Sequence, residues 1–177
     1  MPEPTRRLFF ALWPDPDTRL ALDRAGRALA GKRVRRVPSA NLHLTLAFAG
    51  SVTAPVQDCL EAAAQTVTGA PFELLVDTAG HFPRPRILWL GAATMPPALE
   101  ALAVDLRRVL VDCGLAPETR AFQAHVTIAR RFAQPLPEGE FAPVPWPVSD
   151  FRLVESVQTD AGVRYLPLRG WPLERHV

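Results

Sequence analysis

A short phrase, His-x-Thr, occurs twice in this sequence, each time inside an apolar run that predicts a β-strand. The first copy lies in "NLHLTLAFAG", residues 41–50, and the second in "AFQAHVTIARR", residues 121–131. Because side chains alternate between the two faces of a strand, residues two apart share a face. Each run therefore predicts a strand with one buried face and one face that presents a histidine and a threonine.

Strict alternation gives the two strands the same phase. On the first, the polar face comprises His43, Thr45 and Ala47, and the apolar face Leu42, Leu44, Leu46 and Phe48. On the second, the polar face comprises His125, Thr127 and Ala129, and the apolar face Ala124, Val126 and Ile128. A lone histidine here would indicate an ordinary half-buried strand. Two of the chain's four histidines in matching phrases favour a functional pair.

The remaining sequence predicts alternating strands and helices. Strands are predicted at 6–13, 42–49, 71–82, 86–93 and 121–131, and helices at 18–32, 54–67 and 96–114, followed by a hairpin of 150–158 and 163–169. Asp15 or Asp17 caps the first helix. Residues 134–150 carry so many prolines that we predict loop or extended chain. Each His-x-Thr strand follows a helix, which suggests two similar lobes.

Size and charge limit the kinds of protein this chain can be. Its 177 residues, 48% of them hydrophobic, predict one domain spanning 1–177 with a substantial core. Twenty Lys and Arg against eighteen Asp and Glu leave a formal charge of +2, too small for strong general attraction to polyanions. Nearly all the basic residues are arginines, which suit bidentate phosphate contacts, but compositional bias is the better explanation of their number.

The two cysteines, Cys59 and Cys113, lie in predicted helices and form neither a CxxC motif nor a cluster with histidine. We therefore expect free, buried thiols in a reducing, cytoplasmic compartment. The start, "PTRRLFFALWPDPDTR", superficially resembles a twin-arginine export signal, but its apolar run stops at Pro14 and is too short for one. No segment resembles a membrane span, so we expect no membrane association.

Two histidines facing each other across a groove suit phosphodiester chemistry without a metal. One neutral imidazole accepts a proton from a nucleophile, while one imidazolium protonates the departing oxygen. The threonine hydroxyls and one of Arg130 and Arg131 fit as phosphate ligands. Strict alternation places Arg131 on the His125 face, but a bulge would reverse this. Two imidazoles alone make a poor metal site, and we expect no metal or cofactor.

The other two histidines, His81 and His176, have weaker claims, and we expect structural or solvated roles for them. Base-stacking candidates are the aromatic residues Phe9, Phe10, Phe48, Phe82 and Trp89.

These residues resemble the two-histidine (2H) phosphoesterases, specifically the bacterial and archaeal RNA 2′,3′-cyclic phosphodiesterases, also described as LigT-like or 2′-5′ RNA ligases. The phrases that carry the resemblance are "RLFFAL", "NLHLTLAFAG", "RILWLG", "FQAHVTIAR" and "RYLPLRGWPL". It implies an α+β fold of two pseudo-symmetric lobes, each an antiparallel sheet with outer helices, and an active groove between them.

The resemblance also implies roles for individual residues. His43 would donate a proton to the leaving 3′-oxygen and His125 would activate water. Thr45, Thr127 and Arg130 would bind the phosphate. The implied activity is metal-independent hydrolysis of a 2′,3′-cyclic phosphate at an RNA 3′ end to a 2′-phosphate. Small cyclic nucleotides are further candidate substrates, and from the weak net charge we expect a monomer. The alternatives are a 2′-5′ RNA ligase that joins such an end to a 5′-hydroxyl, and a non-catalytic RNA or nucleotide binder.

Overall fold

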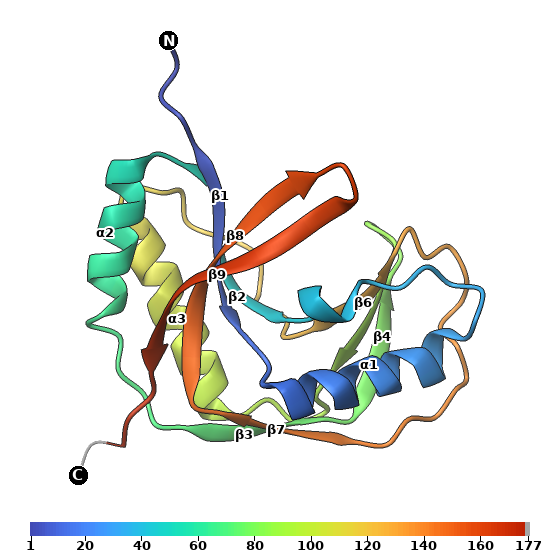
Figure 1. Cartoon of the computed structure of the whole chain (residues 1–177). Coiled ribbons are helices and arrows are strands. Elements are labelled where there is room, and N and C mark those ends of the chain that lie inside the picture. The colour runs from blue at the N-terminus through green and yellow to red at the C-terminus, as the bar shows by residue number, and fades with distance from the viewer. Residues whose placement is uncertain (176–177) are drawn as a thin grey trace.

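In the computed structural model, which describes residues 1–175, three α-helices flank a large antiparallel sheet (Figure 1). The helices are α1 (Pro16–Ala30), α2 (Ala54–Ala64) and α3 (Pro97–Asp112), and a 3₁₀ turn, η1, spans Ser39–Asn41. The strands are β1 (Arg6–Leu12), β2 (Leu44–Val52), β3 (Phe72–Val76), β4 (Thr78–Phe82), β5 (Ile87–Gly91), β6 (Val126–Arg130), β7 (Val144–Val148), β8 (Asp150–Thr159) and β9 (Gly162–Pro172).

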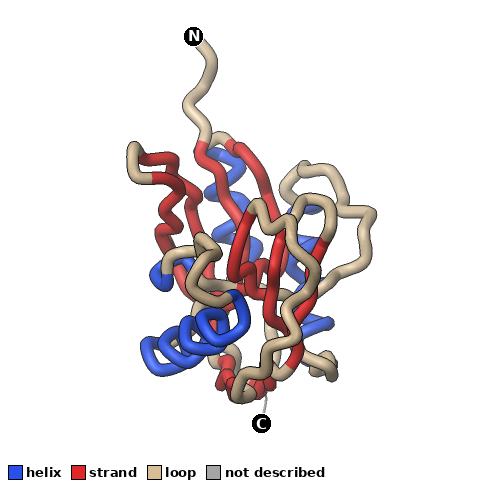
Figure 2. The backbone as a smooth tube through the Cα atoms, turned by 90° about the vertical axis from the view of Figure 1, so that its right-hand side faces the viewer, coloured by secondary structure: helices blue, strands red, loops and turns tan. Residues whose placement is uncertain are grey.

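Seven strands form the large sheet, in the order β4-β5-β6-β2-β1-β8-β9. Its two halves, β4-β5-β6 and β2-β1-β8-β9, meet where β2 pairs with β6 through a single residue pair, Leu44 with Val126. Figure 2 shows these strands in the middle of the molecule, with helices on more than one side. The predicted α+β class, with antiparallel strands and outer helices, is confirmed. The strands of the two lobes are joined in one sheet.

Helix α1 begins as its sequence predicts. The Asp15 side chain caps it by accepting from the Thr18 amide at 2.9 Å, and a proline occupies its first turn. Its buried face packs against β6 and β7. The approach to β6 is close, because a Cβ added at Gly26 would lie 2.9 Å from the Ile128 Cγ2. Helix α1 therefore supports the strand that follows the second histidine.

Helix α3 buries the leucines and valine that its spacing predicts, among them Leu99, Leu102 and Leu106. Each such leucine contributes about 1.5–3 kcal/mol by leaving water. Although α3 precedes β6 in the chain, it packs against β2. Each histidine strand is thus supported by a helix from the other half of the sequence.

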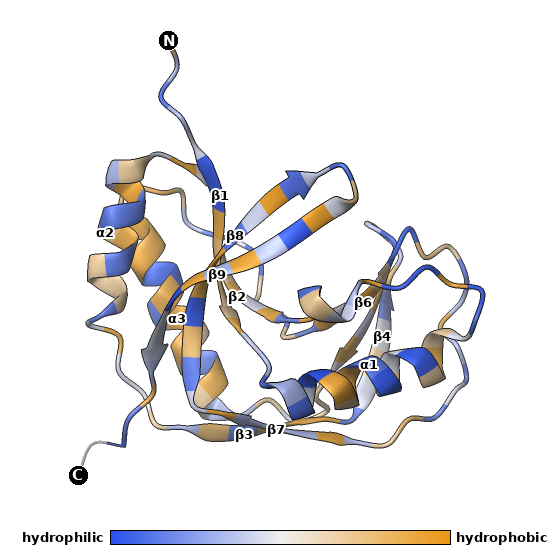
Figure 3. Cartoon of the chain, in the orientation of Figure 1, coloured by the Kyte–Doolittle hydropathy of each residue, from blue (hydrophilic) through white to orange (hydrophobic). Residues whose placement is uncertain are grey.

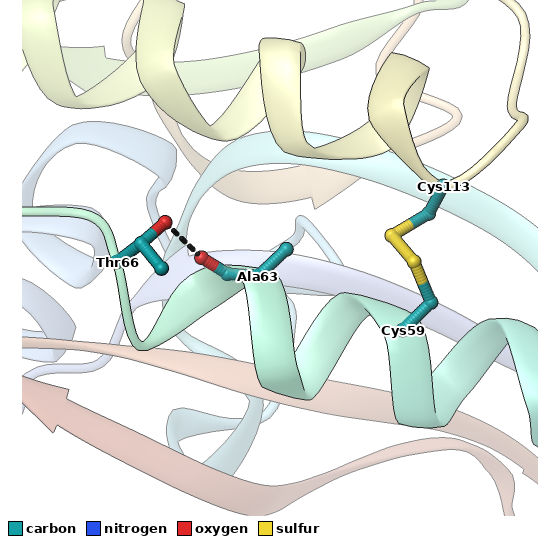
Figure 4. The surroundings of a disulfide bond; sticks show 4 residues. All are labelled: Cys59, Ala63, Thr66 and Cys113. Atoms are coloured by element: carbon teal, nitrogen blue, oxygen red, sulfur yellow. Dashed lines mark hydrogen bonds between the residues drawn. A yellow bond between two sulfur atoms is a disulfide. The ribbon is translucent and has the colours of Figure 1, made fainter.

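A disulfide joins Cys59 in α2 to Cys113 at the end of α3, with an S–S distance of 2.08 Å (Figure 4). The expectation of free thiols is therefore wrong. The helices lie side by side and bring together residues 54 positions apart, which sequence spacing does not reveal. The argument from free thiols for a cytoplasmic location no longer applies.

One strand prediction also needs correction, and the segment predicted as loop or extended chain contains a regular strand. The single strand predicted over 71–82 is broken at Asp77 into β3 and β4, which belong to different sheets. The proline-rich segment forms β7, which pairs with β3 in a separate two-stranded sheet. Pro145 and Pro147 are exposed and alternate with buried Val144, Trp146 and Val148. A two-stranded sheet has only edge strands, where proline is tolerated.

Within residues 1–175, no helix is long and apolar enough to cross a membrane. Figure 3 shows apolar and polar residues alternating along the helices, as expected for elements with one buried face.

Candidate active site

His43 and His125 each lie immediately before a strand, β2 and β6, in the middle of the large sheet. The residues that follow them, Leu44 and Val126, form the one pair that joins β2 to β6. Continuing this antiparallel pairing by one residue places Thr45 opposite His125 and His43 opposite Thr127. The structure thus brings the two predicted His-x-Thr pairs together on one face.

The two imidazole rings are held by equivalent hydrogen bonds. His43 Nδ1 lies 2.7 Å from the Asn41 carbonyl oxygen, and His125 Nδ1 lies 2.8 Å from the Gln123 carbonyl oxygen. A carbonyl only accepts, so Nδ1 carries the proton in both rings and Nε2 is the nitrogen available for proton transfer. His43 Nε2 lies 3.1 Å from the Thr45 hydroxyl oxygen, which donates to it when the ring is neutral.

A β-bulge follows the threonine in both strands. In the pairing of β1 with β2, Ala11 faces Thr45 and Phe10 faces Ala47, so Leu46 is an extra residue in β2. As a result, Leu46 and Ala47 are both buried and Phe48 is 49% exposed. Strict alternation is therefore wrong beyond Thr45. Alternation predicts Ala47 on the polar face and Phe48 on the buried face. Because of the bulge, Ala47 is buried instead and Phe48 is exposed.

The equivalent bulge in β6 decides between the two arginines. Pairing with β5 shifts between Leu88 and Trp89, so Ile128 and Ala129 are both buried. The face of His125 and Thr127 is thereby continued by exposed Arg130. The alternation that favours Arg131 and places Ala129 on this face is wrong because of this extra residue. Arg131 adopts a left-handed backbone, with φ of 56°.

The surroundings of the two histidines differ. Aromatic rings enclose His43, with centroids 4.9 Å away for Phe9, 4.8 Å for Tyr165 and 6.1 Å for Trp13. His125 has Phe82 at 5.2 Å and Trp89 at 6.4 Å.

The packing around the two rings lowers the pKa of both histidines. Burial, followed by the nearby charges of Arg130, His125 and Arg19, lowers the pKa of His43 to about 4 against the opposing hydrogen bond to Asn41. Burial and the Arg130 charge also lower the pKa of His125. Because Arg130 affects both groups, its guanidinium lies within electrostatic reach of both rings. In the free protein both imidazoles are neutral at pH 7.

Sequence reasoning missed Asn41 and Tyr165. The Asn41 side chain is buried and donates to the Val163 carbonyl at 2.8 Å, while it accepts from the Tyr165 amide at 3.2 Å. These two hydrogen bonds connect β9 to the segment that contains His43. The Tyr165 hydroxyl lies 3.5 Å from an Arg130 nitrogen. Tyr165 is the chain's one tyrosine and lies in "RYLPLRGWPL", one of the phrases that carry the family resemblance.

Two cavities adjoin the histidines. The first, of about 520 Å³, is lined by Thr45, His125, Phe48, Phe82 and Phe122, among others. The second, of about 580 Å³, is lined by Asn41 and Tyr165, which contact His43, and by Arg130. The predicted phosphate-binding residues therefore lie between an aromatic cavity and an arginine-lined one.

His81 is away from this pair. Its Nε2 lies 3.0 Å from the Phe132 carbonyl oxygen, and its ring packs edge-on against Phe132. This agrees with the structural role expected for it. His176 lies outside the described residues. Within residues 1–175, no group of three or more His, Cys, Asp and Glu side chains is arranged to hold a metal ion.

Comparison with known proteins gives concordant matches. Residues 14–159 match the family model of the 2′-5′ RNA ligase superfamily. An RNA 2′,3′-cyclic phosphodiesterase of Escherichia coli is 34% identical over 78% of this chain and 80% of its own. One of Aeropyrum pernix is 31% identical over 85% and 92%. The crystal structure of E. coli LigT with 3′-AMP superimposes with a TM-score of 0.89 at 31% identity, covering 97% of this chain and 99% of that one.

Proposed function

Because the chain belongs to the 2′-5′ RNA ligase superfamily, we propose that it is an RNA 2′,3′-cyclic phosphodiesterase. It hydrolyses the cyclic phosphate at the 3′ end of an RNA and leaves a 2′-phosphate. The observation that carries this proposal is the pair of histidines flanking the Leu44–Val126 contact, each with Nδ1–H bound to a backbone carbonyl and Nε2 available.

The reaction is one in-line displacement at phosphorus. His125 Nε2 accepts a proton from water as the water oxygen forms its bond to phosphorus. The bond between phosphorus and O3′ breaks, and His43 Nε2 donates its proton to O3′. The products are a 3′-hydroxyl and a 2′-phosphate, with the proton positions of the two rings exchanged. The chain's own residues perform the acid and base steps, so no metal is required.

Substrate binding favours the protonated form of His43. In the free protein the pKa of His43 is about 4, so this ring is mostly neutral at pH 7. A cyclic phosphate is an anion, and an anion beside an imidazole favours its charged form. Binding therefore raises the pKa of His43 and prepares it as the acid, while more open His125 serves as the base.

The phosphate is held by the residues around the two rings. Thr45 and Thr127 donate hydrogen bonds to its non-bridging oxygens as negative charge develops there. Arg130 adds a charged contact from the same face, oriented by the Tyr165 hydroxyl 3.5 Å away. Once His43 is protonated, its Nε2 carries a hydrogen and can no longer accept from Thr45, which frees the Thr45 hydroxyl to donate to the phosphate.

The terminal base enters the 520 Å³ aromatic cavity. Of the aromatic residues considered for stacking, Phe9 and Phe10 are 3% and 0% exposed and belong to the core. Phe48 is 49% exposed, and Phe82 also lines the cavity. A base whose nucleotide has its phosphate between Thr45 and His125 is therefore adjacent to these two rings.

The test is hydrolysis of a short RNA that ends in a 2′,3′-cyclic phosphate, in EDTA, with the phosphate position of the product determined by NMR. We expect undiminished turnover and a 2′-phosphate. Loss of activity in EDTA would contradict the metal-free mechanism, and a 3′-phosphate would contradict the assigned leaving oxygen. A cytoplasmic location and a monomeric state stay predictions.

A further inference from the structure

The second cavity beside the histidines carries a concentration of positive charge. Five arginines line its 580 Å³: Arg33, Arg35, Arg36, Arg130 and Arg131. In a chain whose net charge is only +2, this is a local excess. Figure 3 shows the loop that follows α1, which carries three of these arginines, as a hydrophilic stretch.

Little in the cavity neutralises this charge. Arg36 pairs with Asp23 at 2.8 Å. Within residues 1–175, the other four lining arginines form no salt bridge, and no Asp or Glu lines the cavity. Guanidinium groups that lack acidic partners and surround a concave space attract an anionic ligand.

Backbone contacts fix this loop beside the catalytic strand. Arg36 bridges Ala129 in antiparallel fashion, and the Val37 amide donates to the Ile128 carbonyl at 2.7 Å. The loop thus lies along β6 just beyond the bulge that presents Arg130. The tip of the β8–β9 hairpin, through Gly162 and Val163, forms another wall. These segments lie in the right-hand half of Figure 1.

We propose that this cavity binds the backbone phosphates of the same RNA strand, upstream of its cyclic end. The inference rests on the proposed function. The cyclic phosphate lies beside Arg130, the terminal base occupies the aromatic cavity, and the preceding nucleotides run past Asn41 and Tyr165 between Arg33 and Arg35. The preferred substrate is therefore an RNA of several nucleotides, and a nucleoside 2′,3′-cyclic phosphate is a poorer one.

The test compares two substrates that share the reacting end: a nucleoside 2′,3′-cyclic phosphate, and a pentanucleotide RNA ending in the same nucleoside cyclic phosphate. The variant is Arg33→Glu with Arg35→Glu, both exposed loop positions. The matched control is Arg108→Glu with Arg175→Glu, also exposed, which changes the net charge equally at two residues that do not line the arginine-rich cavity.

We expect the loop variant to lower the ratio of kcat/KM for the RNA over that for the nucleoside by about tenfold or more, chiefly through KM. The control leaves this ratio unchanged. The slope of log KM for the RNA against the logarithm of the salt concentration decreases by about 1.4, because two phosphate contacts to single-stranded RNA are lost. An unchanged ratio, or equal losses with the loop variant and its control, would overturn the proposal.

A binding measurement separates this inference from the proposed function. Fluorescence anisotropy with a pentanucleotide RNA that ends in a 3′-phosphate reports the upstream contacts without turnover. Weaker binding by the loop variant than by its control supports the phosphate cavity even if no hydrolysis is found. Equal binding by the two variants refutes the cavity, whatever the wild-type protein hydrolyses.

Discussion

The segments around His43 and His125 share a backbone design but not an environment. Both rings bond through Nδ1 to the carbonyl two residues earlier, and both strands bulge after the threonine. Beyond the bulge, however, β2 presents Phe48 and β6 presents Arg130. His43 is enclosed by rings from β1, the following loop and β9, whereas His125 borders the aromatic cavity.

This difference shows how two copies of one motif come to have different surroundings. The local sequence sets the shared ring orientation, because each Nδ1 hydrogen bond joins residues two apart in the chain. The long-range packing sets the acidity, because the groups that lower the pKa of His43 come from distant segments. Two copies of one phrase thus carry rings in different surroundings, and the proposed function assigns the acid to His43 and the base to His125.

The largest expected effect comes from removing either ring. His43→Asn and His125→Asn each lower kcat on a nucleoside 2′,3′-cyclic phosphate by about a hundredfold or more, since the amide replaces the Nδ1–H donor but cannot transfer a proton. The matched control is His81→Asn, which removes a ring that contacts the Phe132 carbonyl, with near-normal kcat expected. If steady-state kinetics find either site variant as active as this control, the proposal that both histidines take part in catalysis is refuted.

Stability in acid offers a second test of the asymmetry. The folded pKa of His43, about 4, lies below its unfolded value of 6.5, so its stabilising contribution is complete above pH 6.5 and is lost as the pH falls toward 4. For a ring that keeps some contact with solvent, this loss is about 2 kcal/mol. Urea unfolding at pH 7 and pH 4.5 should show a smaller decrease for His43→Asn than for the wild type. Equal decreases would contradict the enclosed environment.

The choice between the arginines sharpens the comparison at the bulge. Arg130→Gln lowers kcat/KM for a nucleoside cyclic phosphate by about tenfold to a hundredfold, because a charged phosphate contact is lost. Arg131→Gln gives a much smaller loss, since Arg131 follows the last residue of β6 and lines the cavity proposed for upstream phosphates, which a nucleoside substrate lacks. Parallel kinetics of the two variants decide the matter, and a larger effect at Arg131 would refute the role of the bulge.

The smallest expected effect concerns Phe48, the counterpart of Arg130. Phe48→Ala raises KM for the cyclic nucleotide by about threefold to tenfold with kcat little changed, as loss of one stacking surface predicts. Phe48→Trp retains the stacking surface and is the matched variant, with KM near normal. If both substitutions change kcat and leave KM unaltered, the aromatic cavity does not hold the base.

Sequence patterns predicted all three helices and the two histidine strands, because each helix buries one regularly spaced face and each strand is a short apolar run. Within the strands, alternation holds only as far as the threonine. The proline-rich β7 was missed since Pro145 and Pro147 normally exclude a strand, and only the edge position in a two-stranded sheet permits them. The resemblance selected Arg130 where alternation favoured Arg131.

What the sequence does not encode locally is the extra residue in each bulge, which depends on pairing with β1 and β5. Similarly, the contact of Asn41 with β9 and the Cys59–Cys113 disulfide join residues far apart in the chain. Such contacts arise from the packing of whole elements, so the spacing of these residues along the chain does not predict them.

The most direct test of the two roles is the pH dependence of kcat/KM for a nucleoside 2′,3′-cyclic phosphate in the wild type and both histidine variants. Since this parameter reports the free enzyme, whose histidine pKa values are both lowered, the wild-type profile is a bell with its maximum below pH 6.5. The residual activity of His125→Asn should fall with rising pH, because only a protonated acid remains. That of His43→Asn should rise with pH, because only a base remains. The opposite pair of slopes would reverse the roles of the two strands, and two pH-independent variants beside an unchanged bell would contradict two-histidine catalysis.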